Sequence, residues 1–304
     1  AILISKNGFI KRLAIDTFKS QNRGGRGISG MTTRDEDVIE HLLVTNTHNY
    51  LLCFTNKGRV FKIKAYQVPE SSRQSKGISV AHFLHFDDDE ELTSVIDVTT
   101  FDSKEYLLMA TKKGVVKKTE LSAYSHFKNK PIATINLDQG DRLQWVKKTT
   151  GDKDLILVTS AGMVIRFEES QVRHMGRTSR GIRGIKIRPE DELVSVDVIE
   201  KTEEKATILI ITKYGFGKNM RVNEFRCQNR GGIGVKSINF RKTLKDDQVQ
   251  DATMVSKDHE IMVVTENGTI CRQAVGKIST QRRESMGVKI IKLDDGDKII
   301  AMKG

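Results

Sequence analysis

The densest group of chemically useful residues in this chain is the stretch from Gln21 to Gly27, which reads QNRGGRG. Its glycines let the backbone approach a phosphodiester closely, because no Cβ stands in the way. Arg23 and Arg26 lie between the glycines, and each guanidinium supplies a positive charge and a fork of donors. These residue types and their spacing predict a phosphate contact, and the alternative is a plain glycine-rich connector.

Positively charged segments of this kind recur along the chain. Six glycines each end an aliphatic run and a polar dipeptide, and the six segments that begin at these glycines total 26 basic and 7 acidic side chains. They carry a net charge of +19, whereas the rest of the chain carries −7. A merely solvated basic surface would scatter its charge, so this segregation predicts a basic band that neutralises the phosphates of duplex DNA without reading its sequence. The glycines are Gly8, Gly58, Gly114, Gly162, Gly215 and Gly268, and the segments are 8–27, 58–77, 114–133, 162–181, 215–234 and 268–287.

These glycines recur at nearly regular intervals, which predicts six structural repeats. Each glycine joins two β-branched or apolar runs, which is a hairpin signal with the glycine at positive φ. Units of this size cannot bury their faces alone and must stack. We therefore expect one all-β domain over residues 1–304, a six-bladed propeller-like disc, with a linear solenoid as the alternative. The expected repeats are 1–50, 51–105, 106–154, 155–206, 207–259 and 260–304.

A second landmark ends each segment, always at the same distance from the hairpin glycine, at Gly27, Gly77, Ala133, Gly181, Gly234 and Gly287. An arginine stands four places before it in every repeat except the third, where Asn129 takes its place. The residues two and four places after each hairpin glycine should share one strand face, with the cationic heads free to reach solvent or ligand. The expected DNA-binding residues outside the stretch 21–27 are Lys11, Arg12, Arg59, Lys62, Arg73, Lys76, Lys117, Lys118, Arg166, Arg177, Arg180, Lys218, Arg230, Arg272 and Arg283.

Other chemistry finds little support in the sequence. Gly25 to Gly30 matches GxGxxG but follows a polar stretch rather than a strand, so we expect no dinucleotide site. His82 and His85 lack a third ligand at metal spacing, and the acidic run Asp87 to Glu91 lacks the spacing of a calcium loop. We expect no catalytic residue, no metal and no cofactor here. The three scattered cysteines fit a reducing cytoplasm, and no apolar run is long enough to cross a membrane.

The chain resembles the C-terminal domain of the DNA gyrase A subunit, from the bacterial type IIA topoisomerases. The hallmark of that family is the gyrase-A box, Q-(R/K)-R-G-G-(R/K)-G, and residues 21–27 match it at six of seven positions, with Asn22 in place of a basic residue. Residues 44–61, 109–119 and 164–176 also look like that family, so the resemblance covers essentially the whole chain. A second run, QNRGGIG at residues 228–234, reads as an echo of the box in the fifth repeat. The first alanine, in place of methionine, suggests a domain of a longer protein.

The resemblance implies a β-pinwheel whose blades exchange strands, with DNA wrapped around a basic perimeter so that strand passage introduces negative supercoils. It implies that the box lies between the first and last blades, and that the DNA-cleaving tyrosine, ATP and Mg²⁺ belong to other parts of an ATP-dependent holoenzyme. The implied partners are duplex DNA, the N-terminal region of the A subunit, and the B subunit, in the bacterial cytoplasm at the nucleoid, and the isolated domain should be monomeric. The implied box residues are Gln21, Asn22, Arg23, Gly24, Gly25, Arg26 and Gly27.

Two other functions stay open from the sequence. The corresponding domain of topoisomerase IV should have a similar fold but a missing or degenerate box. A protein-interaction propeller should present an apolar patch and bind no DNA with steep salt dependence.

Overall fold

The computed structural model describes residues 1–15, 39–72, 74–102, 104–127, 130–202 and 206–303. Within these residues the chain is almost entirely β-structure, with one short helix, α1 (Val80–Leu84), after β6. The all-β class predicted from the repeated hairpin signals is confirmed. Single turns of 3-10 helix follow the hairpins, namely η2 (Ala65–Gln67), η3 (Leu121–Tyr124), η4 (Glu169–Gln171), η5 (Val222–Glu224) and η6 (Val275–Lys277).

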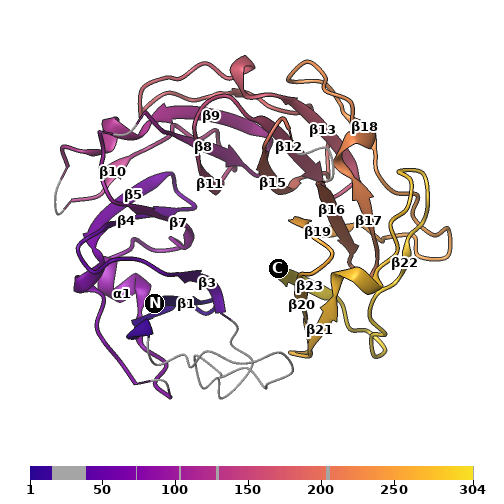
Figure 1. Cartoon of the computed structure of the whole chain (residues 1–304), viewed down its shortest axis with the longest axis horizontal. Coiled ribbons are helices and arrows are strands. Elements are labelled where there is room, and N and C mark those ends of the chain that lie inside the picture. Colours follow the sequence, from indigo (N-terminus) through magenta and orange to yellow (C-terminus); the bar gives the residue numbers. More distant parts are fainter. Residues whose placement is uncertain (16–38, 73, 103, 128–129, 203–205, 304) are drawn as a thin grey trace. The chain divides into compact units, whose positions relative to one another are not determined.

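The strands form six antiparallel sheets (Figure 1). The first three sheets, in hydrogen-bonded order, are β3 (Ile39–Leu43), β1 (Ile2–Ser5), β2 (Phe9–Arg12), β6 (Ile78–Ser79); β7 (Leu92–Val98), β4 (Tyr50–Thr55), β5 (Arg59–Lys64), β10 (Ile132–Ala133); and β11 (Leu143–Thr149), β8 (Tyr106–Thr111), β9 (Val115–Glu120), β14 (Ile182–Arg183). The others are β15 (Leu193–Ile199), β12 (Asp154–Thr159), β13 (Met163–Glu168), β18 (Val235–Lys236); β19 (Val249–Val255), β16 (Thr207–Thr212), β17 (Phe216–Arg221), β22 (Val288–Lys289); and β23 (Ile299–Lys303), β20 (Glu260–Thr265), β21 (Ile270–Ala274).

Each hairpin turns at its glycine, as the sequence predicts. All six hairpin glycines have φ between +72° and +82°, in the left-handed region that favours a residue without Cβ. The turn closes with a hydrogen bond from the glycine N–H to the carbonyl of the Ser or Thr three places before it, for example Gly162 to Thr159 at 2.9 Å. The repeated Ser or Thr and Gly are therefore the two ends of one turn.

The fourth strand of each four-stranded sheet comes from the next repeat, which is the strand exchange that the resemblance implies. Val235 on β18 pairs with Val164, and the preceding residue, Gly234, has φ +75°. A Cβ on Gly234 would lie 2.5 Å from the Val164 carbonyl oxygen, so the approach of the two chains requires glycine. In the third repeat β10 begins at Ile132, and Pro131 takes this place. The landmark assignment of Ala133 is therefore wrong, because that repeat is shorter by two positions.

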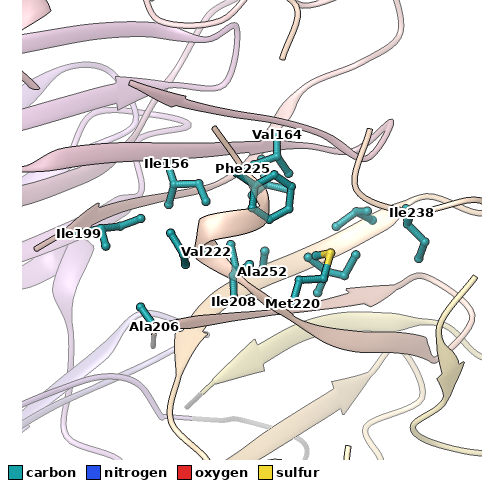
Figure 2. Close-up of a cluster of buried hydrophobic side chains, with 13 residues drawn as sticks. Ile156, Val164, Ile199, Ala206, Ile208, Met220, Val222, Phe225, Ile238 and Ala252 are labelled. Carbon is teal, nitrogen blue, oxygen red and sulfur yellow. The ribbon is translucent and has the colours of Figure 1, made fainter. Parts of the chain in front are cut away.

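The chain divides into two compact units, one made of Ala1–Glu105, Thr119–Lys148 and Gly176–Arg180, and the other of Tyr106–Lys118, Thr149–Met175 and Gly181–Gly304. In the second unit, aliphatic side chains of β12 and β13 pack against those of β16 and β17, and Phe225 fills the space beside η5 (Figure 2). The first unit has an equivalent cluster from β1, β2, β4 and β5. Aliphatic faces of consecutive sheets thus form the core and hold the loops between them.

Candidate nucleic-acid interface

Each basic segment of repeats two to six follows the same path. It starts on the second hairpin strand, passes through the 3-10 turn and a loop, and ends at the two-residue strand at the edge of the preceding sheet. We call the loops between turn and edge strand edge loop two (68–77), edge loop four (172–181), edge loop five (225–234) and edge loop six (278–287). The gyrase-A box, residues 21–27, and Arg73 lie outside the described residues.

Three of the predicted DNA-binding side chains are exposed, and seven are partly buried. Lys76, Arg180 and Arg272 are exposed, although Arg180 pairs with Asp138 and Arg272 with Glu260. The hydrogen bond to Asp138 raises the pKa of Arg180, so its guanidinium stays charged at any working pH. The partly buried cations are Arg12, Arg59, Lys62, Arg166, Arg177, Arg230 and Arg283.

Four of the predicted lysines do not present their ammonium groups at the surface. Lys11, Lys117 and Lys218 are fully buried, and Lys118 is 5% exposed and faces the Glu169 carboxylate at 3.6 Å. A direct phosphate contact by these four residues is therefore incompatible with the structure. Lys117 and Lys118 are consecutive on β9 and point to opposite faces, yet both are buried, so the prediction fails because neither face of this strand is open to solvent there.

The residue four places after each hairpin glycine is mostly committed to the protein. Arg12 Nε donates to the Val68 carbonyl at 3.0 Å, and Arg166 Nη2 pairs with Asp154 at 2.7 Å. Lys62 Nζ donates to the Ser125 carbonyl at 2.7 Å and lies 4.7 Å from the ring centroid of Phe127. The expectation that these cationic heads reach solvent freely is wrong for these three, because they connect one repeat to the next or close their own hairpin.

A set of cations on the edge strands was not predicted from the sequence. Arg183, Lys236 and Lys289 are each the second residue of β14, β18 and β22, and all three side chains are exposed. Each pairs in register with the residue after a hairpin glycine, at Val115, Met163 and Phe216 respectively. Within the described residues none of them forms an ion pair. Their signal was a cation two places after the landmark glycine.

Edge loop five is held by glycines and by its own arginine. The Arg230 backbone N–H donates to Gln171 Oε1 at 2.8 Å, and its guanidinium donates to the carbonyls of Gln171 and Arg183. Gly231 N–H donates to the Gly184 carbonyl at 2.8 Å, with φ of +82° at Gly231. The side chain beneath the loop from the preceding repeat is the buried Ile165, which lies 3.7 Å from the Cβ position of Gly232.

Edge loop six has the same backbone anchor and a different support. The Arg283 N–H donates to Glu224 Oε2 at 3.0 Å, as Arg230 does to Gln171. Beneath the loop lies Lys218, whose Nζ donates to the carbonyls of Arg282, Arg283 and Ser285 at 2.7, 2.8 and 3.0 Å and to Ser285 Oγ at 3.0 Å. Burial lowers the pKa of Lys218 to about 8, with Glu224 opposing the shift and Arg283 adding to it.

Other kinds of site receive no support within the described part of the chain. No group of three or more His, Cys, Asp or Glu side chains there is arranged to hold a metal ion. None of the helices in these residues has the length and apolar character to cross a bilayer. Cys53, Cys227 and Cys271 are free thiols. The described cations at the sheet edges therefore remain the candidate site.

Comparison with known proteins identifies the class that this fold and these basic edges define. A family model described as the DNA gyrase C-terminal domain, a beta-propeller, matches residues 1–46, 49–99, 105–150, 153–200, 206–256 and 259–303. The chain belongs to this family, and the six sheets agree with its propeller description.

Individual relatives place the match within a larger protein. The DNA gyrase A subunit of Staphylococcus epidermidis (strain ATCC 12228 / FDA PCI 1200) is 43% identical over 296 residues, which cover 97% of this chain and 33% of that protein. The DNA gyrase A subunit of Staphylococcus aureus (strain NCTC 8325 / PS 47) is 41% identical over 295 residues, with the same coverage. The chain thus spans about a third of the length of these curated relatives.

Two solved structures share the fold over nearly the whole chain. A crystal structure of the C-terminal domain of DNA topoisomerase IV has a TM-score of 0.87 and 28% identity, covering 99% of this chain and 91% of that one. A structure of a DNA gyrase A C-terminal domain has a TM-score of 0.75 and 27% identity, covering 99% of this chain and 97% of that one.

Proposed function

We propose that this chain binds duplex DNA without base specificity and wraps it along its basic edge loops and edge strands. The observation that supports this most directly is the recurrence of Arg183, Lys236 and Lys289 at one register position of three successive sheets. Cations repeated at the same position of successive sheets are suited to contact phosphates rather than base edges. The phosphates of the DNA backbone are the same for every base sequence, so such contacts carry no base specificity. Contacts spread over several sheets can offset a bending cost of about 1 to 6 kcal/mol for 20 to 30 base pairs.

Within a gyrase holoenzyme, this wrapping would present a segment of the bound DNA for strand passage and so introduce negative supercoils. The relatives are gyrase A subunits, the chain matches about a third of their length, and its family is described as the DNA gyrase C-terminal domain. We assign the N-terminal region of the A subunit and the B subunit as its protein partners in the bacterial cytoplasm. We assign no catalytic residue and no cofactor to this domain, and place ATP and Mg²⁺ in the rest of the holoenzyme.

A topoisomerase IV domain is the second candidate, and the TM-score of 0.87 to such a structure favours it. The QNRGGRG run favours gyrase, because the box should be missing or degenerate in topoisomerase IV. Constrained supercoiling separates the two, since a gyrase-type wrap alters DNA topology strongly.

The decisive experiment is topological. The chain is bound to nicked circular DNA, the nick is sealed, the protein is removed and the linking number is measured. A shift that grows with protein concentration supports wrapping. An unchanged linking number at saturating protein defeats wrapping, and an absence of salt-dependent DNA affinity would favour the protein-interaction alternative.

The edge-strand cations have their own test. Replacing Arg183, Lys236 and Lys289 together by alanine should lower the slope of log affinity against log salt by about 3, because each phosphate contact contributes about 0.9. The matched control replaces Lys242, Lys245 and Lys257, which are exposed and lie outside the basic segments. Equal changes in both variants would show that net charge alone drives binding.

The box tests wrapping apart from affinity. Arg23→Ala with Arg26→Ala should reduce the constrained linking-number change more than it weakens overall binding, because five other basic segments remain. Equal losses in the two measurements would make the box one more phosphate contact.

A further inference from the structure

Lys218 is a charged side chain enclosed within the protein. It lies on β17, three places after the hairpin glycine Gly215, and it is 0% exposed. An ammonium group removed from water must find acceptors within the protein, because its desolvation is otherwise too costly. Where those acceptors come from therefore shows what the lysine holds in place.

All four acceptors of the Lys218 ammonium group come from edge loop six. They are three backbone carbonyls and one hydroxyl within the short stretch from Arg282 to Ser285. The lysine itself belongs to the preceding repeat, so the loop is held from a sheet of the neighbouring blade. With its carbonyls turned inward, the loop leaves Arg282 exposed, while Arg283 Nη1 donates to the Lys236 carbonyl at 3.2 Å.

The same arrangement occurs in the first unit. Lys11, also three places after a hairpin glycine and fully buried, donates to the carbonyls of Ser72 at 3.2 Å and Ser75 at 2.8 Å in edge loop two. Lys117 stands at the same strand position in the third repeat and is likewise buried. Because two separate loops are held in this way, the contact is not an isolated accident of one repeat.

The sequence pairs these lysines with one loop pattern. Lysine occupies this strand position in repeats one, three and five, and the next repeat then carries Arg-x-Ser-x-Gly, at residues 73–77, 177–181 and 283–287. In repeats two, four and six the position holds Phe61, Ile165 and Cys271, and the pattern is absent from repeats three and five, which follow the first two of these. The serine of this pattern supplies an acceptor to the lysine in edge loops two and six.

Fold stability alone does not account for a buried lysine. Replacing a buried charged group by an apolar side chain of similar volume is often neutral or stabilising, because the desolvation cost disappears. What an apolar side chain cannot do is hold three carbonyls of a loop in fixed directions. A loop that is already ordered loses less conformational entropy when its arginines contact a phosphate.

We propose that Lys218 is a positioning residue, which fixes the shape of edge loop six so that Arg282 and Arg283 are placed for contact with DNA phosphates, and that Lys11 does the same for edge loop two. The contact with phosphates rests on the proposed function, whereas the fixing of the loop does not. Lys218 touches no phosphate itself and acts through the loop that it holds.

The test uses Lys218→Met in the full chain, with Lys257→Met as the control that removes an exposed charge from a turn outside edge loop six. Trypsin cleavage after Arg282 and Arg283 should become about tenfold faster in Lys218→Met, since holding contacts worth about 1.4 kcal/mol change an opening equilibrium by that factor. Cleavage elsewhere and the thermal midpoint should change little. Affinity for a short DNA duplex should fall about fivefold, against less than about twofold for the control.

The outcomes separate the two proposals. Unchanged cleavage at Arg282 and Arg283 in Lys218→Met overturns the positioning role, and so does faster cleavage at all sites alike, which marks a general loss of stability. Absence of DNA binding by the unsubstituted chain overturns the proposed function and leaves the cleavage result standing. If Lys218→Met does not fold, Lys11→Met is tested in the same way, with cleavage after Lys76 as the readout.

Discussion

Edge loops five and six occupy the same place in consecutive repeats and share one anchor. In each, the backbone N–H of an arginine donates to the side chain that ends the preceding 3-10 turn, Gln171 in one case and Glu224 in the other. Beneath loop five lies Ile165, and beneath loop six lies Lys218. The same loop of the repeat can therefore be supported in two ways. In edge loop five, glycines let the backbone pack over an apolar side chain, and in edge loop six, a buried ammonium group donates hydrogen bonds to the carbonyl oxygens.

Replacing the apolar side chain beneath edge loop five by lysine should have the largest effect on stability. Ile165→Lys buries an ammonium beneath a loop whose Gly232 carbonyl already accepts from Lys186 N–H at 2.8 Å and whose sequence lacks the serine. We expect the free energy of unfolding to fall by about 3 to 5 kcal/mol, the range for an uncompensated buried charge. Urea unfolding measures it, with Ile165→Met as the control of similar volume. A loss below about 1 kcal/mol would mean that edge loop five accepts a lysine beneath it as well as an apolar side chain.

Two glycines of edge loop five should differ in how much stability is lost when each is replaced by alanine. Gly234→Ala places a Cβ 2.5 Å from the Val164 carbonyl oxygen at φ +75°, and we expect a loss of about 3 kcal/mol or more. Gly231→Ala has the nearest atom at 3.5 Å, so the strain of φ +82° should cost about 1 kcal/mol. Both are read from thermal or urea unfolding. Equal losses would show that backbone strain, rather than close approach, decides both sites.

Much of this fold follows from local signals in the sequence. The hairpin glycines, with a Ser or Thr three places before each, define turns that the structure confirms, and their recurrence gives the number of sheets. The all-β class needs no long-range information, because each hairpin is local. The third repeat was misaligned at Ala133, since Pro131 takes the landmark place in a shortened repeat and a fixed count along the chain cannot detect a deletion.

The site was less predictable, because its chemistry depends on contacts between repeats. Lys218 and Lys11 were expected at the surface, yet both are buried. The carbonyls that accept their hydrogen bonds belong to the next repeat, far away along the chain. Arg183, Lys236 and Lys289 were missed because so short a strand has no periodicity to detect. The pairing of a strand lysine with Arg-x-Ser-x-Gly in the next repeat was present in the sequence and could have revealed the buried lysines.

Arg230 should contribute more to the order of edge loop five than Arg283 contributes to that of edge loop six. Arg230 donates from Nε and Nη1 to two carbonyls, and its loop has no lysine beneath it among the described contacts. Arg230→Ala should therefore weaken protection of loop five against amide exchange by about 1 to 2 kcal/mol. Arg283→Ala should change loop six by less than about 1 kcal/mol, because Lys218 still holds it. The reverse order would assign the support of loop six to Arg283 and not to the lysine.

The smallest effect, and the sharpest in direction, is the response of loop six to pH. Lys218 has a pKa of about 8 in the folded chain against an ordinary 10.5, so between these values the unfolded chain binds more protons. Its contribution to stability is therefore present above pH 10.5 and is lost as pH falls through 8. Glu224 and Arg283 face the same group and set where this change occurs.

The loop should respond in the opposite sense. A neutral amine has two N–H donors for four acceptors, so raising the pH from about 7 to about 9.5 should loosen edge loop six while the chain as a whole gains stability. The measurement compares the chain with Lys218→Met at both pH values, by urea unfolding and by the ratio of their cleavage rates after Arg282. That ratio should shrink towards one at the higher pH. If it stays constant while stability changes, the proton on Lys218 plays no part in holding the loop, and the carbonyls are held by shape alone.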